Sequence, residues 1–392
     1  MVRANQRQLL TIFLIVFIDL LGFGLILPLL PYIAEKYSAS PVTIGLLTAT
    51  YSLFQFLAGP ILGRLSDRFG RRKILILSQL GSVAGYLLLG IAHSLPLLFL
   101  ARLIDGVTGG NISIAQAVMA DLTDKKTRAK GMGLLGAAFG LGFMLGPAMG
   151  GFLSRYGFAT PAFFAAGVGL ITTITTALFL QETVNLRVAK KDPRTKFSWA
   201  NLRTILTTRP ISDLVIAFFL LSLAFSGMQG VYALFVQVKF GWGPTEVGYL
   251  FALVGIVAII AQLKILPTLL SRYGQRTTLK ISVPLLAAGF GIVSLAPNVT
   301  IMLLANTLIP LGNALANPTI TAIATESIPP DEYGETLGIL QSAGSLGRIF
   351  GPIIAGELFA RFNHTAPFQV STLIFIFVAI WILPRITRKS TY

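Results

Sequence analysis

The sequence predicts an all-α membrane protein with twelve transmembrane helices in two pseudo-symmetric six-helix bundles. Three observations carry this prediction. The 392 residues are 54% hydrophobic and only 12% charged, with a mean hydropathy of +0.77, whereas soluble domains are about 25% charged. Apolar runs between the charged clusters reach roughly 20 residues, the length that spans about 30 Å of hydrocarbon. Two glycine-rich segments resemble each other at an interval of about 205 residues.

The apolar runs and the loop signals between them define the predicted helices in order. The first run follows a short basic N-terminus and is too long for a signal-peptide core, so we expect it to remain as a span. The longest polar stretch then divides the chain into an N-terminal bundle (1–181), a cytoplasmic linker (182–209) and a C-terminal bundle (210–392). The twelve predicted spans are centred near Asp19, Phe54, Ala84, Gly106, Leu141, Ile171, Ser222, Val257, Ala288, Ile309, Gly347 and Phe375.

The positive charges predict the orientation of these spans. Of the 31 Lys and Arg residues, two lie in the N-terminus, five in the second loop, four in the fourth, seven in the sixth, three in the eighth and three in the C-terminus. Because cytoplasmic loops are enriched in Lys and Arg, both termini are predicted to be cytoplasmic. The cations outside this pattern are Lys36, Arg155, Lys239 and Arg361 in opposite loops, and Arg102, Lys264 and Arg348 within spans.

The two halves of the chain share sequence features. The segment GLGFMLGPAMGG at 140–151 returns as SLGRIFGPIIAG at 345–356, and SDRFGRRKIL at 66–75 has a weaker counterpart in LSRYGQRTTL at 270–279. Internal duplication is typical of transporters that work by alternating access. Close packing of glycine-rich helices is the alternative explanation of the first pair.

Composition argues against several function classes. The net charge of +16 is spread over alternate loops, not gathered on one face, so no nucleic-acid partner is expected. The absence of cysteine excludes disulfides, thiolate metal sites and cysteine nucleophiles. Both histidines, His93 and His364, fall at predicted loop ends, so a proton relay would run through carboxylates. We expect no metal site, no cofactor and no enzymatic activity.

Four motifs resemble those of a known family. They are FIDLLGFGLILPLLP at 17–31, GRLSDRFGRRK at 63–73, RLIDGVTGG at 102–110 and GLGFMLGPAMGG at 140–151. Together they resemble the major facilitator superfamily in its proton-coupled drug-antiporter branch, and within it the tetracycline–proton antiporters. The resemblance covers nearly the whole chain. The antiporter motif of the fifth helix corresponds here to Gly142, Gly146, Pro147, Gly150 and Gly151.

The resemblance implies the major facilitator fold and a function. We expect a monomeric, multi-pass protein of the bacterial inner membrane that exports a small amphipathic compound, a drug or metabolite, in exchange for protons. Alternatives are a uniporter or lipid-type flippase on the same fold, or a membrane receptor without transport. A receptor is disfavoured because no large soluble domain is present to relay a signal. A membrane enzyme is least expected.

The charged turn at 63–73 is predicted to act in gating. Gly63 would allow close helix approach. Asp67 would face the positive end of a neighbouring helix, which the resemblance implies is the eleventh, and latch the two halves. Arg71 and Arg72 could pair with Asp121, the last acidic residue of the fourth helix. The alternative is a plain topology anchor. The equivalent loop of the second half has Ser271 at the position of Asp67.

Proton coupling is predicted to involve Asp19, Arg102 and Asp105, the ionisable residues deep in the first and fourth spans. A charge at that depth costs at least about 2.5–3.5 kcal/mol, so such residues should be paired or functional. Arg102 and Asp105 share one helix face and could simply pair with each other. Asp19 has no cation nearby in the sequence and is the predicted site where proton and substrate compete.

A further set of residues is predicted to line a substrate cavity. Arg348, in the eleventh span, could be a structural partner of Asp19 or Asp105, or a counter-charge for an anionic or zwitterionic substrate. The others are aromatic or amide residues, which can also face lipid or pack between helices. The predicted cavity residues are Phe23, Tyr51, Gln55, Gln116, Gln229, Tyr232, Gln262 and Arg348.

The sequence departs from tetracycline antiporters at three places. Gly85 and Ala258 stand where that family has an acidic residue and a histidine, and the segment 281–290 lacks the acidic residue of the ninth helix. These departures argue against the metal-chelate handling of tetracycline exporters.

Overall fold

The computed structural model describes residues 2–123, 128–183, 211–328 and 333–387, and within these ranges the ordered elements are helices without strands. The predicted linker 182–209 lies outside the described residues, apart from its first two. The contacts divide the chain into two units.

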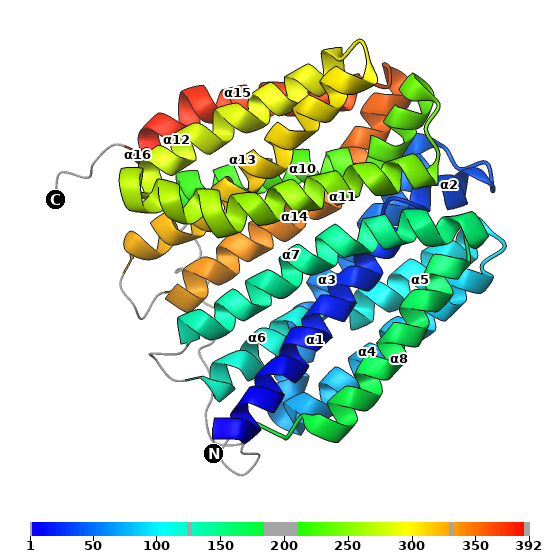
Figure 1. The fold of residues 1–392 in the computed structure, drawn as a ribbon, viewed down its shortest axis with the longest axis vertical. Coiled ribbons are helices and arrows are strands. Elements are labelled where there is room, and N and C mark those ends of the chain that lie inside the picture. The colour runs from blue at the N-terminus through cyan, green and yellow to red at the C-terminus, as the bar shows by residue number, and fades with distance from the viewer. Residues whose placement is uncertain (1, 124–127, 184–210, 329–332, 388–392) are drawn as a thin grey trace. The chain divides into compact units, whose positions relative to one another are not determined.

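The first unit comprises residues 1–39, 50–195 and 242–252. Its helices are drawn in blue to green in Figure 1. It contains α1 (Val2–Ile26), α2 (Leu30–Glu35), most of α3 (Pro41–Phe69), α4 (Arg71–Ile91), α5 (Leu95–Thr108), α6 (Asn111–Leu122), α7 (Arg128–Leu153), the short 3₁₀ turn η1 (Ser154–Tyr156), α8 (Thr160–Phe179) and the first turns of α11 (Pro244–Ile260).

The second unit comprises residues 40–49, 196–241 and 253–392. Two π-helical turns interrupt its helices, at the end of α11 and within the last span. It contains the first turns of α3, α10 (Ile211–Phe240), the rest of α11, the π turn η3 (Ala261–Ile265), α12 (Leu266–Leu295), α13 (Val299–Glu326), α14 (Tyr333–Arg361), α15 (Ala366–Phe377), the π turn η5 (Val378–Ile382) and α16 (Leu383–Thr387).

The helices agree with the predicted twelve spans. Ten stretches of the described residues are long and apolar enough to cross a membrane. One of them, Pro244–Leu295, has 52 residues, more than twice the roughly 20 that a span needs. It bends at Gly274, whose φ of 74° is non-helical, and so supplies the eighth and ninth predicted spans. The 29-residue α14 corresponds to the eleventh, and α5 with α6 form the fourth.

The first unit is built around α1, which packs along α7 and α8, while α4 packs on α5 and α8 (Figure 1). Glycines permit the closest of these approaches. A Cβ at Gly146 would lie 2.7 Å from the carbonyl oxygen of Leu21, and one at Gly142 would lie 2.7 Å from the Cβ of Leu20. Without a hydrophobic force between helices in lipid, such small residues let backbones meet.

The second unit repeats this arrangement, with α10 packed along α14 and α12 on α13 and α15. Gly347, the counterpart of Gly142 in the repeated motif, brings α14 against α10. A Cβ there would lie 2.7 Å from the backbone nitrogen of Leu223. The duplicated sequence motif therefore corresponds to a duplicated helix contact. An aromatic cluster fills the unit's interior, with Tyr232, Phe235 and Phe368 fully or nearly fully buried.

Candidate functional site

Asp19 lies in the C-terminal half of α1 and is hydrogen-bonded to an amide. The Nδ2 of Asn111 donates to its Oδ1 at 3.1 Å. Asn111 is the first residue of α6 and is 1% exposed. It stands there because the fourth span breaks at Gly109 and Gly110, which directs the next side chain inward. Sequence reasoning missed Asn111, although a polar residue directly after a Gly-Gly break inside a span was an available signal.

Arg102 and Asp105 form a buried ion pair on α5. The Nη1 of Arg102 lies 2.9 Å from Oδ2 of Asp105, and their side chains are only 3% and 5% exposed. The guanidinium carbon also lies 4.5 Å from the ring centroid of Tyr51, a favourable cation–π distance. The structure thus contains the ion pair with Arg102 that was one of the two interpretations of Asp105, the other being a role in proton coupling. It leaves the coupling role a prediction.

The face of α4 toward Asp105 carries small and hydroxylic residues. A Cβ at Gly85 would lie 3.0 Å from the Cβ of Asp105 and 3.3 Å from the carbonyl oxygen of Ala101. Ser82 lies on the same helix, with its Oγ 3.3 Å from Oγ1 of Thr108. An acidic side chain at position 85 would therefore need α4 and α5 to move apart, which gives a steric reason for this departure from the tetracycline pattern.

Three predicted cavity residues of the first unit come together. The rings of Phe23 and Tyr51 have centroids 5.0 Å apart. Gln55 donates through Nε2 to the Tyr51 hydroxyl at 2.9 Å and to the carbonyl of Gly109 at 2.8 Å. Gln116, on α6, is exposed. This places a short polar and aromatic strip beside the Arg102–Asp105 pair.

The predicted cavity residues of the second unit are more dispersed. Tyr232 is 2% exposed, and the amide of Asn306 donates to its hydroxyl inside the aromatic cluster. The burial of Tyr232 comes from packing inside its own unit, and its predicted contact with substrate stays a prediction. Gln229 is half-buried and Gln262 is exposed on the π turn η3. The Nη2 of half-buried Arg348 donates to Oγ of Ser345 at 2.7 Å. Its predicted pairing with a carboxylate of the first unit stays a prediction.

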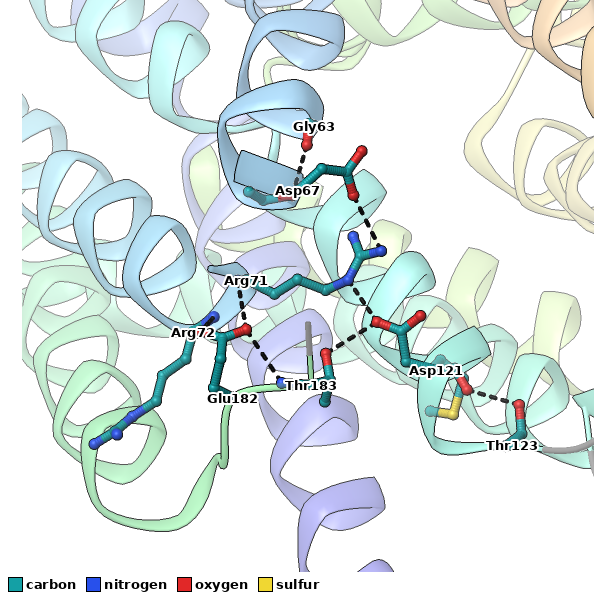
Figure 2. A network of polar contacts seen from close by, with 10 residues as sticks. Gly63, Asp67, Arg71, Arg72, Asp121, Thr123, Glu182 and Thr183 are labelled. Atoms are coloured by element: carbon teal, nitrogen blue, oxygen red, sulfur yellow. Dashed lines mark hydrogen bonds and ion pairs between the residues drawn. The ribbon is translucent and has the colours of Figure 1, made fainter. Parts of the chain in front are cut away.

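The charged turn forms a polar network around Arg71 (Figure 2). Its Nε lies 2.6 Å from Oδ2 of Asp121, and its Nη2 lies 3.2 Å from Oδ1 of Asp67. Arg71 itself is 6% exposed, so one buried guanidinium holds the ends of α3 and α6 together. Gly70 makes the turn between α3 and α4, because its φ of 104° is one that side chains rarely adopt.

Two expectations about this turn need revision. Arg72 was expected to share Asp121, but its Nη2 donates to the carbonyl of Ala177 at the end of α8. Gly63 was expected to allow close helix approach, yet no atom lies within 4 Å of a Cβ placed there among the described residues. Its role in gating stays a prediction.

Glu182 is a member of the network that sequence reasoning missed. Its Oε1 accepts the backbone N–H of Arg71 at 2.8 Å and its Oε2 that of Arg72 at 3.2 Å, as Figure 2 shows. These are otherwise unpaired donors at the first turn of α4, where a carboxylate also meets the positive helix end. Next to it, Thr183 Oγ1 donates to Asp121 at 2.9 Å. The start of the predicted linker is therefore tied to the charged turn.

The residues of the antiporter motif lie along two contacts of α7. Gly142, Gly146 and Gly150 face α1. The ring of Pro147 comes within 3.0 Å of a Cβ placed at Gly24 of α1. Gly151 instead meets the beginning of α11, where a Cβ would lie 2.6 Å from the Cα of Gly248. The small residues of the motif thus allow α7 to pack closely against both α1 and the beginning of α11.

Comparison with known proteins identifies the family. The model of the Major Facilitator Superfamily matches residues 12–287 and 240–391. A tetracycline resistance protein of class B from Escherichia coli is 30% identical over 356 residues, which are 90% of this chain and 88% of that protein. Multidrug resistance protein 1 of Bacillus subtilis is 30% identical over 384 residues, 96% of both chains.

Solved structures show the same fold. The human organic anion transporter MFSD10 superposes with a TM-score of 0.73 at 23% identity, covering 97% of this chain and 99% of that one. A bacterial homologue of the lysosomal transporter Spinster has a TM-score of 0.77 at 17% identity, covering 98% and 97%. The predicted fold class is confirmed. The chain therefore belongs to the major facilitator superfamily and is a multi-pass membrane transporter, not an enzyme.

Proposed function

We propose that this transporter exports a small amphipathic compound in exchange for protons, by alternating access. One observation carries the proton part. Asp19 is a carboxylate in the middle of a span, and the partner found for it among the described residues is the neutral amide of Asn111. A charge at this depth without a cation is costly, so the carboxylate gains most from taking up and releasing a proton.

The amide of Asn111 suits both states of Asp19. Its Nδ2 donates to the carboxylate, as the structure shows. Its Oδ1 is buried and has no hydrogen-bond partner among the described residues, so it can accept from a protonated carboxyl group after a small rotation. The Arg102–Asp105 pair supplies the neighbouring charges whose movement would change the proton affinity of Asp19 between the two access states.

The driving force is sufficient for export. Each proton moved down a potential of 100 mV releases about 2.3 kcal/mol, and each pH unit adds about 1.4 kcal/mol. The relatives named for tetracycline and multidrug resistance support an organic, amphipathic substrate for this chain. The polar and aromatic strip of Phe23, Tyr51 and Gln55 would contact it, with Gln116, Gln229, Gln262 and Arg348 as further candidates.

The charged turn would be the gate. Asp67, held by Arg71, would latch the half-transporters on the cytoplasmic side, and Glu182 would couple the linker to this latch.

We further propose that the protein lies in a bacterial inner membrane, has both termini in the cytoplasm and is a monomer. Light scattering of the purified protein tests the oligomeric state. Single cysteines at either terminus test the orientation, because the chain has no native cysteine.

The deciding experiment uses inside-out vesicles loaded with a pH-sensitive dye and a panel of amphipathic compounds of each charge, tetracycline included. At least one compound should release protons on addition, and Asp19→Asn should abolish this release while the protein remains folded. Asp213→Asn is the control, since Asp213 is a buried carboxylate of α10 that lies 3.9 Å from Arg385. Full proton-linked transport by Asp19→Asn would refute the proposal.

A further inference from the structure

A small cleft opens within the first unit between α1, α4 and α8. Its polar lining consists of Asp19 from α1, Gln79, Ser82 and Tyr86 from α4, and Thr172 from α8. The aromatic strip of Phe23 and the other predicted cavity residues does not contribute to it. The cleft therefore gives Asp19 a second polar neighbourhood, distinct from the hydrogen bond to Asn111.

Gln79 is the unusual residue of this cleft. Its side chain is buried, with 6% exposure, yet neither Nε2 nor Oε1 has a hydrogen-bond partner among the described residues. Leaving such an amide unpaired in a dry interior is costly, so buried amides are almost always satisfied by protein or ordered water. A polar cleft with several donors and acceptors is the kind of site that holds water. Gln79 therefore points to hydration of the cleft.

Of the residues that line the cleft, Asp19 is the carboxylate and Tyr86 the other titratable group. The helix α8 carries no titratable residue, and the titratable residues of α7 are Arg128 and Lys130 in its first turn. On α4 the only titratable residue after the cations of its first turn is Tyr86. On α5, Arg102 and Asp105 pair with each other, and α6 contributes only Asp121 at its far end.

We propose that this cleft is a hydrated route by which protons reach Asp19, separate from the path of the substrate. The inference rests on the proposed proton coupling. A water molecule in the cleft gives a proton to the carboxylate of Asp19 and regains one from the next water, so no other reactant is needed. Gln79 acts as a positioning residue, because its amide can donate to one water and accept from another.

The proton itself is the probe in the test. Purified protein in liposomes on a solid-supported membrane is exposed to a pH jump without substrate, and the transient current reports charge moving to Asp19. Asp19→Asn should abolish the current. Gln79→Leu removes both polar atoms at similar size and should slow the rise of the current roughly tenfold without reducing the total charge. Its thermal stability should equal or exceed that of the wild type, because an unpaired buried amide is lost.

Two neighbouring threonines provide a matched pair. Thr172 and Thr173 are both 5% exposed and both donate to a backbone carbonyl one turn earlier, but only Thr172 lines the cleft. Thr172→Val should slow the current, and Thr173→Val should not. If Gln79→Leu fails to fold, the comparison of these two threonine variants decides whether the cleft carries protons to Asp19.

The outcomes separate the two proposals. An unchanged current in Asp19→Asn would refute proton coupling and, with it, the route. A current lost in Asp19→Asn but as fast as wild type in a folded Gln79→Leu would refute the route alone. Equal slowing by Thr172→Val and Thr173→Val would also refute it, because general packing would then be the cause.

Discussion

The buried pair of Arg102 and Asp105 should make a large, non-additive contribution to stability. Removing one partner of a buried ion pair leaves an uncompensated charge and costs about 3–5 kcal/mol. With side chains 3% and 5% exposed and 2.9 Å between the charged atoms, this pair belongs to that class. We expect Arg102→Met to approach the upper value, since it also loses the cation–π contact with Tyr51, worth about 2 kcal/mol when desolvated.

The double variant Arg102→Met/Asp105→Asn should be no less stable than Arg102→Met alone, because replacing both partners removes the unpaired charge. The measurement is equilibrium unfolding in mixed micelles, analysed as a double-mutant cycle. The control is the pair of Arg361 and Glu357, which lies 2.6 Å apart but is 75% and 38% exposed. The coupling energy from the double-mutant cycle of this exposed pair should be about 1 kcal/mol or less.

Additive losses in the Arg102–Asp105 cycle would refute this reasoning. They would mean that water reaches the pair and that each side chain acts on its own. A coupling energy as small as that of the exposed control pair would lead to the same conclusion.

Three further predictions concern the charged turn and the second unit. Glu182→Ala removes the acceptor of two backbone N–H groups at the start of α4 and should lower the free energy of unfolding by about 0.5–2 kcal/mol. Glu182→Gln should lower it less. An unchanged free energy of unfolding in Glu182→Ala would contradict the capping role. Asp67→Asn should increase labelling of cysteines introduced along α3 and α14 from the cytoplasmic side, and unchanged labelling would count against a latch. Arg348→Lys should weaken transport, because an ammonium cannot reproduce the forked hydrogen bonds of a guanidinium. Arg348→Ala should reduce the transport of anionic or zwitterionic substrates more than that of cationic ones. An equal loss of transport for substrates of every charge would leave Arg348 only a structural role.

The fold could be predicted from the sequence because its determinants are local. A span needs only enough consecutive apolar residues to cross hydrocarbon, and each such run is visible without knowledge of its neighbours. The glycines of the duplicated motif were visible in the same way. Gly142 and Gly347 stand at equivalent positions, and both let a helix approach the first helix of its own unit. The eighth and ninth predicted spans lie in one continuous helical stretch of the structure, and the bend at Gly274 separates them.

The candidate site could be predicted only in part, because its partners are distant in sequence. The pairing of Arg102 with Asp105 follows from their spacing on one helix. Spacing along one helix gives no such indication for the other partners. Asn111 bonds to Asp19, 92 positions away, and Glu182 to the backbone of Arg71, 111 positions away. Gln79 lines the same cleft as Asp19, 60 positions away.

The sequence by itself determined that this chain is a helical, multi-pass protein with ionisable residues deep in two spans of the first bundle and a charged turn between its second and third spans. Only the tertiary structure decided which groups meet. It showed that Arg71, not Arg72, holds Asp121, that Tyr232 is enclosed by its own unit, and that Asp19 faces both an amide and a polar cleft. The physical reason is that hydropathy and spacing act along one helix, whereas hydrogen bonds and burial depend on how helices pack against each other.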